Sequence, residues 1–199
     1  EQVSNILQLK ISDKNIFDVT NPKILVAGCG TGLHAISAKQ KFKQAEVLAI
    51  DLSHSSLAYA ERKSRELNIK DISYMQADIL DLRKLERKFD VVECSGVLHH
   101  MKDPLAGLRV LADCLKTSGL IRISLYSKLA RQHIKRLRKV HTSEPMEDGN
   151  ARLYSFRDIA KNSEDPDYKK ILNSSDFYNL SSVRDLVFHV QEHQFTISE

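Results

Sequence analysis

Residues Ile24–Gly32, with the sequence ILVAGCGTG, decide the expected fold of this chain. The first four are apolar, as in a strand buried on both faces of a parallel sheet, and the apolar spacing of residues 33–39 predicts a helix. Between them three glycines stand at alternate positions, and such a turn lets a ligand approach the backbone at a helix N-terminus. Asp51 follows the next apolar run and offers a carboxylate to a pair of ribose hydroxyls. The sequence therefore indicates a nucleotide-like ligand.

The alternation of strand and helix continues to Tyr126. Further strands are predicted at 46–51, 71–75, 89–94 and 120–126, with helices at 53–67, 82–88 and 103–115 and a turn at 117–119. Right-handed crossovers between such units give a parallel sheet. We therefore predict an α/β fold, a doubly wound Rossmann-like sheet with helices on both faces.

After Tyr126 the pattern becomes helical. Helices are predicted at 128–141, 156–162, 168–173 and 183–191, the last capped by Ser181 and Ser182, with a polar loop at 142–150 and a short terminal strand at 195–197. This divides the chain into an N-terminal segment packing on the core (1–22), a ligand-binding core (23–127) and a helical lid or substrate segment (128–199). Basic residues of 128–139 are spread around their helix without interleaved aromatics, which favours a solvated face or a lid over nucleic-acid binding.

Composition excludes several classes of protein. The 199 residues are 42% hydrophobic and 28% charged, as in an ordinary globular domain, and the net charge of +4 does not indicate a nucleic-acid-binding protein. No apolar stretch reaches the roughly 20 residues of a membrane helix. Three cysteines without metal-ligand spacing suit a reducing cytoplasm, and no metal site is expected. Because the chain begins with Glu1, we expect a piece of a longer protein.

Four motifs together carry a resemblance to a known family. A dinucleotide fingerprint needs G-x-G-x-x-G, whereas these glycines are spaced G-x-G-x-G. That spacing, Asp51, the Ala77-Asp78 pair and the segment LHHMKDP at 98–104 resemble the class I S-adenosylmethionine-dependent methyltransferases. The resemblance covers residues 23–126. It implies S-adenosyl-L-methionine as methyl donor and S-adenosyl-L-homocysteine as product, on a sheet that here lacks the last strands of the family.

The resemblance also implies a role for each motif. The glycine loop would wrap the methionine part of the donor, Asp51 would bind the ribose and Asp78 the adenine amino group. Residues 94–97, at the end of the fourth strand, would line the sulfonium. The implied donor-binding residues are Ala27, Gly28, Cys29, Gly30, Thr31, Gly32, Asp51, Leu52, Ala77, Asp78, Ile79, Cys94, Ser95 and Gly96. One position departs from the family: Val26 stands where members often carry an acid, so the donor's ammonium needs another acceptor.

Each of these residues also has a purely structural interpretation. The glycines would permit a tight turn, while Asp51 and Asp78 would cap the helices that follow them. His99 and His100 are the candidate catalytic residues, because an imidazole titrates near neutral pH and can act as a general base. Buried structural histidines are the alternative, and methyl transfer to a well-held acceptor does not always need a base.

The segment around His99 resembles enzymes that methylate small molecules such as quinone precursors. Residues 176–181 (DFYNLS) and 184–193 (RDLVFHVQEH) resemble the tail of bacterial methyltransferase-like proteins that often carry tetratricopeptide repeats upstream. We therefore expect a cytoplasmic methyltransferase domain acting on a small molecule. The alternatives are a protein methyltransferase, a donor-binding module without catalysis, and a nicotinamide-dependent oxidoreductase.

Overall fold

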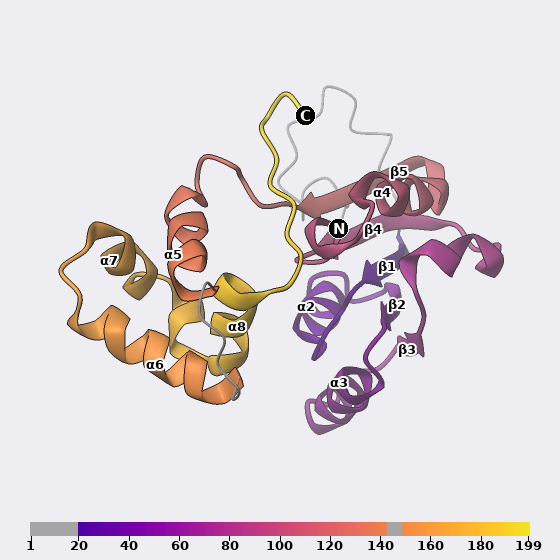
Figure 1. The fold of residues 1–199 in the computed structure, drawn as a ribbon. Helices are drawn as coiled ribbons and strands as arrows, with labels where there is room; N and C mark the ends of the chain where they lie inside the picture. The colour runs from indigo at the N-terminus through magenta and orange to yellow at the C-terminus, as the bar shows by residue number, and fades with distance from the viewer. Residues whose placement is uncertain (1–19, 143–148) are drawn as a thin grey trace. The chain divides into compact units, whose positions relative to one another are not determined.

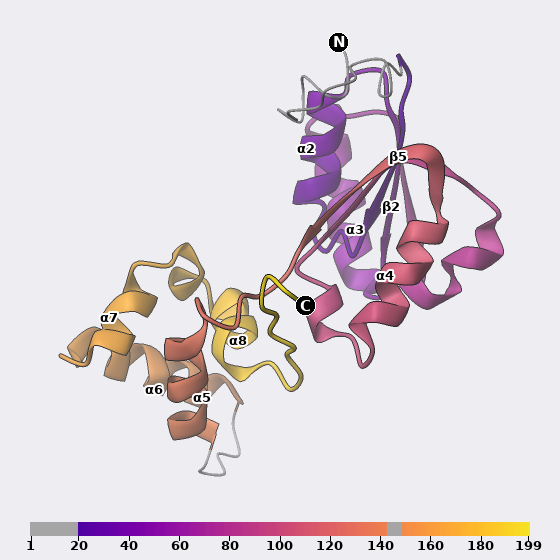
Figure 2. The same ribbon diagram turned by 90° about the horizontal axis from the view of Figure 1, so that it is seen from above.

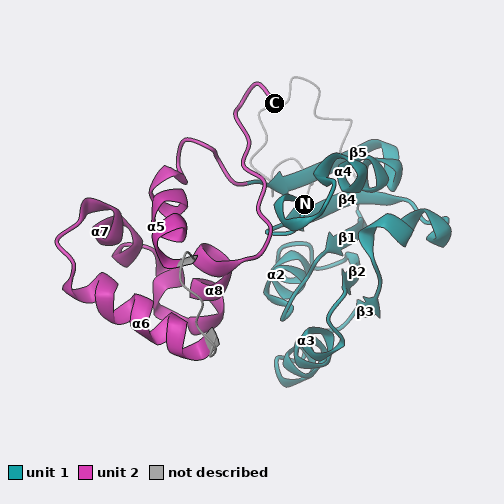
Figure 3. Cartoon of the chain, viewed as in Figure 1, with its two compact units in different colours: residues 1–125 teal, residues 126–199 magenta. Residues whose placement is uncertain are grey.

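A computed structural model describes residues 20–142 and 149–199, shown from two directions in Figures 1 and 2. The chain forms two compact units, residues 1–125 and 126–199, which Figure 3 colours separately. Of the predicted N-terminal segment 1–22, residues 1–19 lie outside the described residues. Within the described part of the chain, no helix is both long enough and apolar enough to cross a membrane.

The first unit is built on a five-stranded parallel sheet. Its strands are β1 (Lys23–Ala27), β2 (Glu46–Asp51), β3 (Ile72–Gln76), β4 (Phe89–Ser95) and β5 (Leu115–Ser124), in the spatial order β3-β2-β1-β4-β5. β1 pairs in parallel with β2 on one side and with β4 on the other. The predicted doubly wound α/β fold is confirmed.

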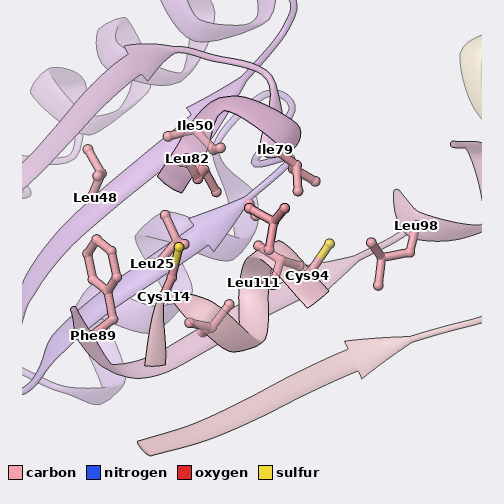
Figure 4. Close-up of a cluster of buried hydrophobic side chains, with 13 residues drawn as sticks. Leu25, Leu48, Ile50, Ile79, Leu82, Phe89, Cys94, Leu98, Leu111 and Cys114 are labelled. Atoms are coloured by element: carbon pink, nitrogen blue, oxygen red, sulfur yellow. The ribbon is translucent and has the colours of Figure 1, made fainter. Parts of the chain in front are cut away.

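Helices cover both faces of this sheet, as Figure 2 shows. On one face, α2 (Leu33–Lys41) and α3 (His54–Glu66) pack against Ile24 and Val26 of β1. On the other, α4 (Pro104–Asp113) and the 3₁₀ segment η2 (Ile79–Leu85) pack against Leu25 and Ala27. Figure 4 shows the second of these clusters, to which Leu25, Leu111 and Cys114 belong. Successive residues of β1 thus enter opposite cores, which explains why the whole run is apolar.

Side-chain caps set where several helices begin. The Ser53 hydroxyl accepts a hydrogen bond from the Ser56 amide at the start of α3, and the Asp103 carboxylate does the same for Ala106 in α4. Pro104 occupies the first turn of α4, where a missing amide costs no hydrogen bond. Asn68, predicted to end α3, has a φ of 59° just beyond it. The predicted starts of these two helices are confirmed.

Two predictions in the first unit are wrong. The turn expected at 117–119 is part of β5, which begins at Leu115 because that residue pairs with Phe89 before the register shifts at Val91. The helix expected at 82–88 is a 3₁₀ segment that starts earlier, at Ile79, because Asp78 caps it. In both cases a pairing or a cap outweighed the local pattern.

The second unit is helical. It contains α5 (Gln132–Thr142), α6 (Gly149–Asn162), α7 (Pro166–Leu172), the 3₁₀ segment η4 (Ser175–Tyr178) and α8 (Leu180–Phe188). They share a core around Phe156 and Phe177, both fully buried. The helix predicted at 156–162 begins at Gly149, so residues 149 and 150 are not loop. The Asn179 carboxamide, rather than Ser181 or Ser182, caps α8.

The terminal strand predicted at 195–197 is reduced to one bridge. Phe195 pairs in parallel with Ser127, and its amide donates to the Tyr126 carbonyl at 2.8 Å. The Lys128 amide donates in turn to the Phe195 carbonyl at 2.9 Å. These bonds tie the end of the chain to the residues just before α5.

The basic segment 128–139 is only in part the solvated face that the sequence predicts: its lysines and Arg136 are exposed, but all three of its arginines form ion pairs. Arg131 is buried and pairs with Glu192, Arg138 pairs with the same carboxylate, and Arg136 pairs with Asp167. All three ion pairs lie inside the second unit. The segment therefore stabilises its own unit with charges that appear, in sequence, to be spread around a helix.

Candidate functional site

The order of the strands creates a crevice at one edge of the sheet. From β1 the chain steps outward through β2 and β3, then crosses back to place β4 on the other side of β1. The loops after β1 and β4 therefore depart to opposite faces of the sheet. In open parallel sheets ligands bind at this switch point, beyond the carboxyl ends of the strands.

A cavity of about 370 Å³ lies at this edge. Its walls come from the loops after β1, β2, β3 and β4, and most of them are apolar. The lining residues are Gly28, Asp51, Leu52, Ala77, Asp78, Ile79, Leu80, Val97, His100, Met101 and Lys102. A cavity of this size with a few convergent polar groups is typical of a small-molecule site.

The glycines of the loop after β1 let this loop approach the loop after β4 closely. Gly28 has a φ of +73°, and a Cβ on it would lie 2.1 Å from Cγ2 of Val97. Gly32 has a φ of +92°, and a Cβ there would lie 2.6 Å from Cβ of Ala60 in α3. Two of the three glycines are thus required both by backbone conformation and by close packing.

Asp51 links the ends of two strands. One carboxylate oxygen accepts a hydrogen bond from the Gly30 amide at 2.8 Å, and the other accepts one from the Ser53 amide at 2.8 Å. Since each oxygen has a second acceptor position, the carboxylate can still bind two hydroxyl groups. The structural and the ligand-binding interpretations of Asp51 are therefore compatible.

The same holds for Asp78. One of its oxygens accepts from the Leu80 amide at 2.8 Å and so caps η2, while the residue also lines the cavity. Leu52 and Leu80 belong to the same wall, and their side chains are 67% and 49% exposed. Exposed leucines beside a carboxylate form a surface on which a flat, partly polar ring can pack.

Several residues implied by the resemblance do not line the cavity. Ala27, Cys29 and Cys94 are buried in the cores of the sheet. Gly30, Thr31, Gly32 and Gly96 belong to the adjoining loops, and Ser95 is the last residue of β4.

The buried cysteines are poor nucleophiles. Burial, reinforced by the charge of Asp51, raises the pKa of the Cys29 thiol to about 12. Burial likewise raises the pKa of the Cys94 thiol to about 12. Because the thiolate is the reactive form, neither residue can attack a substrate near neutral pH.

The two histidines have different surroundings. His99 is only 1% exposed, whereas His100 is partly exposed and lines the cavity. Their rings meet edge to face with centroids 4.3 Å apart. Of the two, His100 is placed to meet a ligand.

Three lining residues were given no role from the sequence: Leu80, Met101 and Lys102. Each lies within two residues of a predicted site residue or of the histidine pair. Their position in the sequence could have identified them, because each follows a predicted strand. The loops that follow parallel strands meet at the carboxyl ends of those strands, where the cavity lies.

The sheet register reveals an acid beside Val26. Val26 aligns with Glu93 in the neighbouring strand β4, so the two side chains point to the same face of the sheet. Glu93 is buried, and one of its carboxylate oxygens lies 3.5 Å from Arg122 Nη1 in β5. The carboxylate that the family often carries on β1 thus has a counterpart one strand away.

Among the described residues, no group of three or more His, Cys, Asp or Glu side chains is arranged to hold a metal ion. The site's polar groups are carboxylates, an imidazole, the Lys102 ammonium and backbone amides. Residues 24–119 match a family model described as a methyltransferase domain. This part of the chain is a class I S-adenosylmethionine-dependent methyltransferase domain.

Curated relatives share this domain. The chain is 36% identical over 119 residues to an uncharacterized protein of Synechococcus sp., covering 59% of this chain and 28% of that protein. It is 31% identical over 118 residues to the ubiquinone biosynthesis O-methyltransferase of Neisseria meningitidis serogroup C, covering 59% of this chain and 49% of the enzyme. The chain therefore spans less than half the length of either relative.

A solved structure resembles a larger part of the chain. PKMT2 from Rickettsia typhi in complex with AdoHcy aligns with a TM-score of 0.69 at 18% identity, covering 88% of this chain and 36% of that one. At this identity the likeness concerns the fold alone. The methyltransferase domain has the parallel sheet with helices on both faces that the sequence predicts.

Proposed function

We propose that the methyltransferase domain binds S-adenosyl-L-methionine in the cavity beyond β1 and β4 and transfers its methyl group to a small-molecule acceptor. The observation that carries the proposal is the meeting of the Asp51 carboxylate, the Gly28 turn and an apolar wall in one cavity of about 370 Å³. These groups fit the donor, which combines a ribose diol, a flat base and a charged amino-acid chain.

Each part of the donor has a candidate partner. The free acceptor positions of Asp51 suit the two ribose hydroxyls, and Leu52 and Ile79 offer apolar surface to the adenine. Asp78 has a second oxygen for the adenine amino group. The loop from Gly28 to Gly32 would hold the methionine part through its backbone groups.

Glu93 is our candidate for the acceptor that Val26 cannot provide. Its carboxylate is on the same face of the sheet as Val26, in the strand that ends at the switch point. A buried carboxylate beside a cationic ligand gains an interaction that compensates part of its desolvation. Glu93 would therefore hold the donor's ammonium, in competition with Arg122.

Methyl transfer requires few chemical steps from the protein itself. The bound donor supplies an activated methyl group, and the domain must orient the acceptor in line with it and exclude water. His100 is the residue we propose to take a proton from an acceptor hydroxyl, because it lines the cavity and an imidazole is the side chain most often used as a general base. His99, which is buried, would support the His100 ring through their edge-to-face contact.

A small-molecule acceptor is supported by the Neisseria relative, an O-methyltransferase of ubiquinone biosynthesis that is 31% identical over 118 residues. The helical unit 126–199 is our candidate for the segment that recognises the acceptor. Three buried free cysteines suit a reducing compartment, so we propose that the protein acts in the cytoplasm.

One observation favours a second function. Val26 stands where family members often carry an acid, and its side chain cannot bind the donor's ammonium. A donor-binding module without catalysis would tolerate the loss of this contact. A protein acceptor in place of a small molecule is a further alternative.

Calorimetry separates the donor hypothesis from its competitors. The 199-residue chain is titrated with S-adenosylmethionine, S-adenosylhomocysteine and NAD. We expect saturable binding of the first two and none of NAD; binding of NAD alone would refute the proposal.

A second experiment tests methyl transfer: labelled S-adenosylmethionine is incubated with the protein and either a metabolite extract or a protein extract. Label in small molecules supports the proposed acceptor class, label in proteins supports the alternative, and donor binding without transfer supports the module.

A further inference from the structure

The second unit contains a polar cavity of about 410 Å³ that shares no lining residue with the cavity proposed for the methyl donor. It lies between the α5 segment and the chain that follows α8. The lining residues are Lys128, Lys135, Arg138, Val190, Glu192 and Gln194. Every one of them belongs to the second unit, so the cavity is complete within it.

The basic wall follows from helical spacing. Lys128, Arg131, Lys135 and Arg138 are separated by three, four and three residues, which places them along one side of α5 and the turn before it. The opposite wall is held in place at both of its ends. Phe195 is bonded to Tyr126 and Lys128 through the backbone, and Arg138 donates to the His189 carbonyl.

The carboxylate at the base of the cavity is fully occupied. Glu192 accepts hydrogen bonds from Arg131 at 3.0 and 2.7 Å, from Arg138 at 3.0 Å and from Gln194 at 2.7 Å. A carboxylate has about four acceptor positions, so none is left for a ligand. Burial alone would raise the pKa of Glu192, but the hydrogen bonds from Arg131 and Gln194 lower it, and the group is ionised at neutral pH.

The remaining charge of the cavity is positive. Lys128 and Lys135 make no ion pair with a described residue, and the one lining carboxylate, that of Glu192, is paired with Arg138. The two lysines therefore contribute two positive charges to the lining that Glu192 does not balance. Outside the lining, Arg131 adds one positive charge, and Glu199 adds one negative charge near Lys128. Hydrogen bonds from Thr196 and then the Lys128 charge lower the pKa of Glu199, which is therefore also ionised.

From this charge balance we infer that the cavity is a binding site for a phosphate monoester, with Lys128 and Lys135 as the residues that hold the phosphate. A monoester carries close to two negative charges at neutral pH, since its second pKa is about 6, and so matches the surplus. A phosphodiester, as in a nucleic-acid backbone or most phospholipids, carries one charge, as does a carboxylate. The site should therefore prefer a soluble monoester to either.

Binding is tested by calorimetry on the 199-residue chain with methyl phosphate, dimethyl phosphate and acetate, at pH 7.5 and constant ionic strength because salt screens such contacts. We expect saturable binding of methyl phosphate and affinities at least about tenfold weaker for the two monoanions. The variant Lys128→Gln/Lys135→Gln should lose about tenfold or more, while Lys161→Gln, an exposed lysine of α6, should match the wild type.

Chemical-shift mapping on the wild type supplies a readout that does not depend on any variant. Methyl phosphate should move the amide signals of residues 190–194 and 128–135. Three outcomes would overturn the inference: no saturable binding of methyl phosphate, equal affinity for dimethyl phosphate, or the same loss in the double variant and in Lys161→Gln. Because the methyltransferase cavity contributes none of these residues, failure here leaves the proposed donor site untouched.

Discussion

Replacing Gly28 by alanine tests the packing of the glycine loop. The φ of +73° costs an alanine about 1–2 kcal/mol. The new Cβ would also lie 2.1 Å from Cγ2 of Val97, and overpacking of this kind costs about 1–3 kcal/mol. Gly28→Ala should therefore lower the free energy of unfolding by about 2–5 kcal/mol.

Gly30 provides a matched control. Its φ is +53°, and a Cβ on it would meet nothing within 4 Å, so Gly30→Ala should cost only the conformational part, about 1–2 kcal/mol. Both substitutions remove the same flexibility from the unfolded chain, so that effect cancels when the two are compared.

Val97→Ala isolates the steric part. It removes the two methyl groups nearest the new Cβ and leaves Cβ of Val97 at 3.2 Å, which a small shift accommodates. In the background of Val97→Ala, the cost of Gly28→Ala should fall by about 1–3 kcal/mol, a coupling that a double-mutant cycle measures.

Urea denaturation followed by circular dichroism gives these free energies; the chain has no tryptophan for fluorescence. Equal losses for Gly28→Ala and Gly30→Ala, together with no coupling to Val97, would refute the close approach of the loops after β1 and β4. Calorimetry with S-adenosylhomocysteine on the same variants then shows whether the approach matters to the donor.

Three further predictions concern the same unit. Asp51→Ala should weaken binding of S-adenosylhomocysteine by about 1–3 kcal/mol in calorimetry. The control variant Asp103→Ala removes the cap of α4 and should leave this affinity unchanged. Equal affinities for wild type and Asp51→Ala would exclude the ribose contact. Glu93→Gln should weaken S-adenosylhomocysteine but not methylthioadenosine, which lacks the ammonium group, and an equal loss for both ligands would contradict the role of Glu93. The fold raises the pKa of the Cys94 thiol from 9.0 to about 12, so its stabilising contribution is complete below pH 9 and is lost as the pH rises toward 12. Above pH 9 the unfolding free energy should fall by up to about 1.4 kcal/mol per pH unit for this thiol. The slope should be shallower in Cys94→Ala, where the Cys29 thiol still contributes, and a slope as steep as that of the wild type would contradict the assignment to Cys94.

The sequence by itself determined the elements of the methyltransferase domain and the motifs between them. A buried strand, a glycine turn and a helix leave local patterns, because apolar spacing, caps and φ preferences act within a few residues. For this reason the strand at 46–51 and the starts of α3 and α4 were predicted correctly. Asp51 and Asp78 could be singled out in the same way, since each follows a predicted strand.

Only the tertiary structure decided which distant residues meet. The contact of Gly28 with Val97 and the alignment of Val26 with Glu93 depend on β4 returning to lie beside β1. The basic segment shows the same limit, because Arg131 finds Glu192 across 61 residues. Local spacing states which face of a helix or strand a side chain occupies, but the partner of that face is set by packing between elements. A charge that is solvated in one packing is buried and paired in another, and no local pattern distinguishes them.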